Sequence, residues 1–337
     1  MTGASLPRHA SARILASHRA ASGDCPGMNR LGCMLAISLV AAAAPAQTWT
    51  YPLNPRATFL RTNNDSPVAP LILDLASLGV MPGSWLRIGT TGAFRHINGG
   101  ADNYRNLIAV FSSNNQLLAT SVQNRVPGAV AAGSAFASGA TFYGSLPMDI
   151  AQDFFCSRDQ WDANIAVRVP AGATHLFLGV HDSLYNDNVD PNGDFAAVVS
   201  VEPTPSLPGT SEHLELRGAV GSTPATSPDV HATTPGAPML AELRYPIGFA
   251  DGSLYVLVGD TVATGSTPLQ LLPNLWTPNL IVVQVGILPS TPGWTAPWQL
   301  STPGGLTGTT LVIQAGALVP TARNGLYVTS NAHRYVL

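Results

Sequence analysis

The feature that most constrains the fold of this chain is a series of short apolar runs separated by clusters of Gly, Asn and Pro. Runs of this length that are rich in β-branched residues and bounded by turn-forming residues predict β-strands. Gly (32 residues) and Pro (28) are abundant and only 10% of the residues are charged, which argues against long surface helices. We therefore predict an all-β protein, with strands in residues 85–89, 107–111, 163–169, 176–180, 195–201, 214–217, 240–245, 254–258, 280–285, 311–314 and 326–329.

A proline-rich stretch divides these runs into two groups. Residues 202–210 contain three prolines in nine residues and have no apolar periodicity, which favours an extended connector. We predict two β-sandwich domains, both jelly-roll-like or galactose-binding-like, one at 47–204 and the other at 205–337. Within the first domain, Asn114-Asn115 predicts a hairpin turn, because Asn tolerates the positive φ that such turns require.

The first 46 residues have the pattern of a secretory signal peptide. Arg30 precedes the apolar run 31–44, and small residues that suit a cleavage site follow the run. A run of this length is shorter than the roughly 20 residues that a membrane-spanning helix requires. We predict translation from Met28, cleavage after Ala46, no integral membrane span, and a secreted protein that is extracellular, periplasmic or at the cell surface.

The charges and motifs argue against several classes of function. All 16 basic residues are Arg, against 19 acidic residues, and no Lys/Arg-rich face is evident that could neutralise the phosphates of a nucleic acid. The chain has no nucleophile elbow, no His-Glu-x-x-His, no phosphate-binding loop and no dinucleotide fingerprint. One cysteine remains after the predicted cleavage, Cys156, and we expect a buried thiol rather than a nucleophile. We predict a non-enzymatic protein that binds no nucleic acid.

The most informative segment is an oxygen-rich loop between two predicted strands. Residues 181–194 contain four Asp and three Asn in a chain that is poor in charge. Carboxylates this close repel one another unless a cation neutralises them, and carboxylate, carboxamide and carbonyl oxygens are the ligands that Ca²⁺ prefers. The sequence therefore predicts a calcium site, and the alternative is a solvated acidic turn without metal.

Two ligand sets are compatible with the spacing. The first is the alternating set Asn188, Asp190 and Asn192, followed by Gly193-Asp194, which is similar to an EF-hand loop but lacks the bidentate Glu. The second is formed by Asp182, Tyr185, Asp187 and Asn188, with residues 189–193 as an excursion. We predict a metal site at Asp182, Tyr185, Asp187 and Asn188, with Asp190 or Asn192 as further ligands.

A family resemblance supports the second set. Residues 169–182, followed by Tyr185-Asn-Asp-Asn188 and Gly193-Asp-Phe195, resemble the calcium-loop signature of the PA-IL-like galactophilic lectins, which are small secreted β-sandwiches. The resemblance implies side-chain ligands at Asp182, Asp187 and Asn188, a main-chain ligand at Tyr185, and an ion that coordinates two sugar hydroxyls. The chain departs from the family in the additional residues 190–192 and in lacking the His-Pro loop that grips the galactose ring.

Other polar and aromatic residues could contact a carbohydrate. Asp102 and Tyr104 could supply hydroxyl-bonding and ring-stacking groups beside Asp182, Asp187 and Asn188, and an ordinary turn is the alternative. Three tryptophans of the C-terminal half either stack on sugars or fill the core. The closing pattern at residues 325–331, Gly-Leu-Tyr-Val-Thr-Ser-Asn, resembles C-terminal β-domains appended to many secreted proteins of environmental bacteria.

Three functions remain open from the sequence. We predict a secreted, calcium-dependent, lectin-like protein that binds a carbohydrate or glycoconjugate. The first alternative is a structural or adhesive protein of a surface or matrix, stabilised by calcium. The second alternative is a secreted glycoside-active hydrolase, because glycoside hydrolysis needs only two carboxylates at a suitable separation.

Overall fold

Short strands dominate the structure, a computed structural model that describes residues 47–62, 65–132, 141–158, 164–210, 214–245, 252–289, 293–294, 298–301, 305–320, 322 and 324–337. This part of the chain contains twenty β-strands and one short 3-10 helix, η1 (Ala76–Leu78). The predicted all-β fold class is confirmed, and each predicted run overlaps a strand. The predicted start at Met28 and cleavage after Ala46 lie outside the described residues. Within them, no helix is long and apolar enough to span a bilayer.

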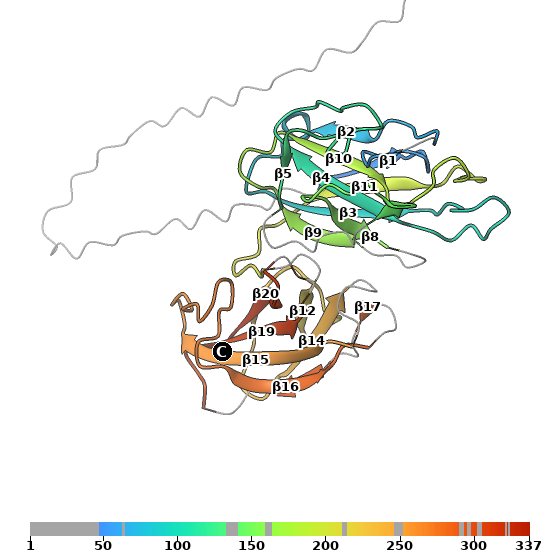
Figure 1. The fold of residues 1–337 in the computed structure, drawn as a ribbon. Helices are drawn as coiled ribbons and strands as arrows, with labels where there is room; N and C mark the ends of the chain where they lie inside the picture. Colours follow the sequence, from blue (N-terminus) through green and yellow to red (C-terminus); the bar gives the residue numbers. More distant parts are fainter. Residues whose placement is uncertain are drawn as a thin grey trace, which may run out of the picture. The chain divides into compact units, whose positions relative to one another are not determined.

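The strands of the N-terminal group form two antiparallel sheets (Figure 1). One sheet has the order β1-β11-β3-β9, and the other has the order β2-β10-β4-β5, with β8 also paired to β4. β6 and β7 pair only with each other among the described strands. The bounds are β1 Thr48–Pro52, β2 Leu71–Asp74, β3 Trp85–Thr91, β4 Leu107–Ser112, β5 Ala129–Val130, β6 Phe142–Tyr143, β7 Leu146–Pro147, β8 Phe154–Ser157, β9 Asn164–Arg168, β10 His175–Val180 and β11 Ala196–Glu202.

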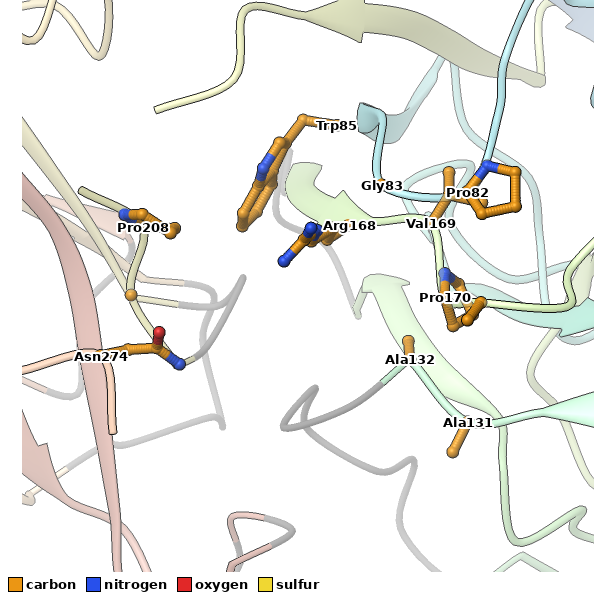
Figure 2. A pocket seen from close by; sticks show the side chains of 12 residues that line it. Pro82, Gly83, Trp85, Ala131, Ala132, Arg168, Val169, Pro170, Pro208 and Asn274 are labelled. Carbon is orange, nitrogen blue, oxygen red and sulfur yellow. The ribbon is translucent and has the colours of Figure 1, made fainter. Parts of the chain in front are cut away.

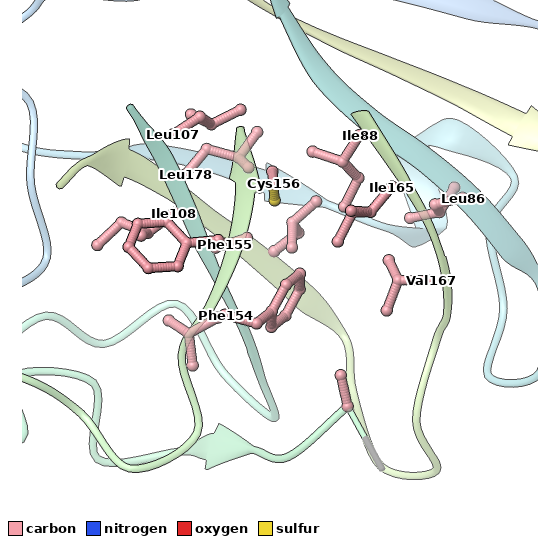
Figure 3. Packing of buried hydrophobic residues seen from close by; sticks show 14 of the residues in the cluster. Leu86, Ile88, Leu107, Ile108, Phe154, Phe155, Cys156, Ile165, Val167 and Leu178 are labelled. Atoms are coloured by element: carbon pink, nitrogen blue, oxygen red, sulfur yellow. The ribbon is translucent and has the colours of Figure 1, made fainter. Parts of the chain in front are cut away.

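Alternating side chains of these strands form a hydrophobic core. Leu86 and Ile88 of β3 are fully buried, as are Ala197 and Val199 of β11, and every residue of β4 is buried. Figure 3 shows Cys156 of β8 among the apolar side chains of β3, β4 and β9. Its thiol is a buried part of this core, as the sequence predicts, and burial raises its pKa.

The predicted hairpin at Asn114-Asn115 is wrong. After β4 the chain enters a loop, and no strand follows at residues 117–118. The loop is held by Arg125, which is only 4% exposed. Its guanidinium donates hydrogen bonds to the main-chain oxygens of Leu118 (3.1 Å), Thr58 (3.1 Å) and Leu60 (2.9 Å).

The strands of the C-terminal group form two further sheets. One has the order β12-β14-β17, with β18 also paired to β14, and the other has the order β13-β20-β19-β15-β16, in which only the β13–β20 pair is parallel. Leu257, Ile313 and Tyr335 are buried in their core. The bounds are β12 Glu215–Val220, β13 Val230–Ala232, β14 Pro238–Tyr245, β15 Leu254–Ala263, β16 Ile281–Ile287, β17 Gly293–Trp294, β18 Trp298–Ser301, β19 Thr309–Leu318 and β20 Tyr327–Val336.

An ion-pair network connects the two groups of strands. Arg87 of β3 makes two hydrogen bonds to the carboxylate of Glu215 in β12, at 3.1 and 3.0 Å, and its Nε lies 3.1 Å from Oε1 of Glu202. Burial alone would raise the pKa of Glu215, but Arg87 holds it below its ordinary value. Residues 45–337 form one compact unit, and a domain boundary near residue 205 stays a prediction.

Candidate metal centre

The oxygen-rich loop connects β10 with β11 and is therefore held at both ends by the sheets. β10 pairs with β2 and β4, whereas β11 pairs with β1 and β3. The middle of the loop is fixed as well, because Val189 exchanges main-chain hydrogen bonds of 2.8 and 3.0 Å with Arg95. A loop fixed at three points loses less conformational entropy when it binds a ligand.

Tyr185 anchors the first half of the loop. Its side chain is fully buried. The phenol oxygen donates to the main-chain oxygen of Val180 (3.1 Å) and accepts hydrogen bonds from Thr58 Oγ1 (3.1 Å) and the Asp182 amide (3.3 Å). Burial raises the pKa of Tyr185, so the phenol stays neutral and keeps its proton for Val180. These bonds fold residues 182–185 into a fixed turn.

Three side-chain oxygens of this half of the loop are buried without a hydrogen-bond partner among the described residues: Asp182 Oδ2, Asp187 Oδ1 and Asn188 Oδ1. The Asn188 side chain is 1% exposed, and its Nδ2 donates to the main-chain oxygen of Pro55 at 3.0 Å. That bond leaves the carboxamide oxygen as the atom without a partner. A buried acceptor that lacks a partner costs about 1–3 kcal/mol, and a charged one costs more.

The surroundings of Asp182 shift its pKa upward. Burial raises the pKa of Asp182, and the nearby Asp187 raises it further, whereas hydrogen bonds from Ser183, Leu184 and Asn188 oppose the shift. A divalent cation bound between them would reduce the repulsion between the two carboxylates. The described residues hold no metal-binding group of three or more His, Cys, Asp or Glu side chains, so a site here depends on carboxamide and carbonyl oxygens as well.

Tyr185 could add its main-chain oxygen, as the lectin resemblance implies. This oxygen accepts one long hydrogen bond, from the Asn188 amide at 3.3 Å, and a carbonyl oxygen has a second lone pair for an ion. The donor set of Asp182, Tyr185, Asp187 and Asn188 consists of hard oxygens only, which suits Ca²⁺ better than a transition metal.

Asp190 and Asn192 have a different environment. Both carboxylate oxygens of Asp190 accept main-chain hydrogen bonds from its own turn, one from Gly193 (2.9 Å) and one from Phe195 (3.1 Å). Asn192 Oδ1 accepts a weaker bond from the Asp194 amide, at 3.4 Å. Gly193 has the positive φ, 72°, that this turn requires. The oxygens without partners therefore all belong to the second of the two predicted ligand sets, with Asn188 common to both sets, whereas Asp190 and Asn192 of the alternating set close the turn.

Asp102 and Tyr104 lie in a neighbouring loop. Phe94 and Tyr104 exchange main-chain hydrogen bonds of 2.9 and 3.0 Å, and the Tyr104 ring packs against His96 with the ring centres 3.6 Å apart. Asp102 Oδ1 is buried without a partner among the described residues. Burial raises the pKa of Asp102, and the charges that act on it are those of Asp194, Arg95 and Asp190. This loop thus faces the second half of the oxygen-rich loop.

One residue of this site, Asp65, was missed in the sequence. Its Oδ2 accepts a hydrogen bond of 2.5 Å from the Tyr185 amide, and its Oδ1 accepts one from Ser66. Asp65 therefore positions the main chain of Tyr185 from the segment between β1 and β2. The only sequence signal is a polar stretch at residues 63–66, more than a hundred residues from the loop it supports.

A cavity of about 520 Å³ lies elsewhere on the molecule and shares no residue with the oxygen-rich loop. Figure 2 shows the side chains of Trp85 and Arg168 on its wall, with Pro208 and Asn274 across from them. Most of the other lining residues are Pro, Ala and Gly, and none is a carboxylate. Among the described lining residues, the cavity therefore offers no carboxylate for a cation or for acid–base chemistry.

Comparison with known proteins gives little further information. No family model matches the chain, and no curated protein matches it. Among solved structures, Bacteroides uniformis beta-glucuronidase 2 covalently bound to cyclophellitol-6-carboxylate aziridine is similar with a TM-score of 0.21 and 8% identity. The match covers 80% of this chain and 26% of the glucuronidase chain, so this chain spans about a quarter of the length of the glucuronidase. A likeness this distant carries no argument about function.

Proposed function

We propose that this chain is an exported, calcium-dependent carbohydrate-binding protein. Its Ca²⁺ is held by the side chains of Asp182, Asp187 and Asn188 and by the main-chain oxygen of Tyr185. The observation that carries the proposal is the group of three buried oxygens without hydrogen-bond partners among the described residues. Ca²⁺ takes six to eight oxygen ligands, so positions left open by the protein are available to the hydroxyl groups of a sugar.

The residues around the three oxygens hold them in place before an ion binds. The Tyr185 phenol fixes the turn that begins at Asp182, and Asp65 fixes the Tyr185 amide. The bond from Asn188 Nδ2 to Pro55 orients the amide so that its oxygen remains available. A preorganised set of ligands lowers the ordering cost of binding. A carbohydrate would then be recognised without any change of covalent bonds.

Calcium titration of two matched variants tests the metal site. Asp187→Asn removes a charge at an oxygen that has no partner, and we expect it to weaken Ca²⁺ binding strongly, by about ten-fold or more. Asp190→Asn is the matched control, because both of its carboxylate oxygens are already used by the turn. Isothermal titration calorimetry should show retained binding for the control. Retained binding in Asp187→Asn and loss in Asp190→Asn would support the alternating ligand set instead.

Glycan retention, measured with Ca²⁺ and with a chelator, tests the carbohydrate part of the proposal. We expect retention that disappears with the chelator and in Asp187→Asn. A calcium-stabilised structural or adhesive protein is the second candidate. It is favoured by the burial of Asn188 and by the packing of the Tyr104 ring against His96, which leaves that ring less free to stack on a sugar. Calcium-dependent thermal stability without glycan retention would support this candidate.

We propose binding without catalysis, because the oxygens of Asp182 and Asp187 are needed by the ion. Incubation of the protein with polysaccharides, followed by detection of released reducing ends, tests this point. Turnover that is lost in Asp182→Asn would support the hydrolase instead.

A further inference from the structure

β16 (Ile281–Ile287) is an edge strand with a β-bulge in its pairing to β15. In the sheet β13-β20-β19-β15-β16 it is the terminal strand, and β15 is the only partner recorded for it among the described residues. Its sequence, Ile-Val-Val-Gln-Val-Gly-Ile, contains neither a charged residue nor a proline. Natural proteins usually protect such an edge with Lys, Pro, a bulge, a short strand or a covering segment, because unpaired main-chain groups pair readily with another strand. β16 has the bulge but neither Lys nor Pro.

The side chains of β16 are exposed on both faces of the sheet. Val282, Val285 and Ile287 pair with alternate residues of β15 and share one face with them, and they are 58%, 49% and 59% exposed. Ile281 and Gln284 pair with the intervening residues of β15 and are also exposed. The opposite sheet therefore covers β15 but does not cover β16.

The apolar surface continues from the edge onto the outer face of the sheet. A cavity of about 410 Å³ lies there, and its floor includes Leu254, Val256, Val282 and Leu318. No charged residue lines it. Between Asp260 and Arg323 the sequence contains no Asp, Glu, Lys, Arg, His, Cys or Tyr at all. An exposed apolar surface of this kind on a folded protein marks a contact with another molecule.

We propose that the partner is a second copy of this chain, joined by antiparallel pairing of β16 with β16 across a two-fold axis. A two-fold interface brings the same surface patch of each copy together, so that patch must be self-complementary. The neutral stretch between Asp260 and Arg323 meets this condition, because two copies bring no like charges together there.

Edge pairing with a second copy accounts for the exposed side chains of β16 better than two other possible occupants, a sheet packed on the outer face or a hydrocarbon ligand. It pairs main-chain groups on the side of β16 away from β15 and places partner side chains beside both faces of the strand. One main-chain group of β16, the Val285 oxygen, already accepts a hydrogen bond from the Gln284 side chain at 3.2 Å. A sheet packed on the outer face would leave Ile281 and Gln284 exposed. A hydrocarbon ligand in the 410 Å³ cavity would leave the whole edge unpaired.

The oligomeric state of the chain from residue 45 onward tests the proposal. At a protein concentration of tens of micromolar, we expect a dimer by light scattering and by sedimentation. The dimer should form both with Ca²⁺ and with excess chelator, so the result does not depend on whether the proposed metal site exists. Val285→Lys places two like charges at the joined edges and should weaken the dimer by about ten-fold or more. Val122→Lys, at a 40% exposed position of the N-terminal group, is the matched control and should remain dimeric.

A cross-linking experiment covers the case in which Val285→Lys fails to fold. Residues 45–337 contain one cysteine, Cys156, which is buried. Gln284→Cys should give a disulfide-linked dimer on mild oxidation, whereas Val122→Cys should not. A monomeric wild type, a dimer that persists in a folded Val285→Lys variant, or equal cross-linking of both cysteine variants would overturn the proposal. A monomer that binds uncharged phosphatidylcholine vesicles would overturn it in favour of a lipid surface.

Discussion

Two aspartates of one loop, Asp187 and Asp190, are equivalent in the sequence and different in the structure. Asp187 Oδ1 is buried without a partner among the described residues, whereas both oxygens of Asp190 accept main-chain hydrogen bonds. Sequence patterns located the loop and its oxygen-rich character. They could not separate the two roles, because these depend on which amides a turn directs inward and on Asp65, a residue far away in the chain.

His333 shows the same limit in the C-terminal group, where no sequence pattern distinguishes it. It is fully buried, its Nε2 donates to the main-chain oxygen of Leu216 at 2.9 Å, and its Nδ1 lies 2.9 Å from Nε2 of His231. Burial is the largest cause that lowers the pKa of His333, to about 4, and His231 lowers it further. The Leu216 carbonyl and the charges of Asp229 and Glu215 act in the opposite direction.

We predict that the buried His333 makes the protein less stable in mild acid. The ordinary pKa of 6.5 applies to the unfolded chain, so between pH 6.5 and about 4 the unfolded chain binds more protons than the folded one. The free energy of unfolding should therefore fall as the pH falls through this window, by about 3 kcal/mol in total from this residue. Urea unfolding at several pH values measures the effect. His333→Gln keeps a donor for Leu216 and does not titrate, and an equally steep pH dependence in this variant would contradict the prediction.

At the scale of elements, apolar periodicity located the long strands and failed where polar residues lie inside them. β20 continues to Val336, well beyond the predicted end at residue 329. β20 contains the buried polar residue Asn331, whose side chain hydrogen-bonds to the main chain of β12. Its Oδ1 accepts a hydrogen bond from the Leu216 amide at 2.8 Å, and its Nδ2 donates one to the Leu216 carbonyl at 3.0 Å. β1 was missed because its alternating exposed and half-buried residues end in a proline and lie at the edge of the sheet.

The loop between β10 and β11 should respond to calcium in its first half only. If Ca²⁺ binds at Asp182, Asp187 and Asn188, their main chain becomes more ordered, and amide hydrogen exchange of residues 182–188 should slow. The amides of Gly193 and Phe195 are already bonded to the Asp190 carboxylate, and their exchange should change little. Hydrogen exchange with Ca²⁺ and with chelator measures this contrast. Equal slowing along the whole loop, or slowing that persists in Asp187→Asn, would count against the assigned ligands.

At the scale of the whole molecule, the all-β class followed from composition and short apolar runs, but the relation between the two groups of strands did not. A proline-rich connector is compatible with two independent domains, and also with two groups that share contacts. The ion pairs between them involve Arg87, Glu202 and Glu215, which lie far apart in the sequence and carry no motif. Only the folded chain shows that Arg87 neutralises a carboxylate whose side chain is 8% exposed.

Arg87 tests whether the two groups of strands unfold together. Arg87→Ala would leave the buried Glu215 without its main partner, since Arg244 lies 3.9 Å away, and removing one partner of a buried ion pair costs about 3–5 kcal/mol. If the groups depend on each other, this loss should lower the stability of the single unfolding transition of the chain. Arg217→Ala, at the more exposed pair with Glu242, is the matched control and should cost about 1 kcal/mol. Urea unfolding followed by tryptophan fluorescence and circular dichroism measures both. Two separate transitions in the wild type would show that the groups unfold independently, whereas equal losses in both variants would show that the Arg87–Glu215 pair contributes no more than the more exposed pair.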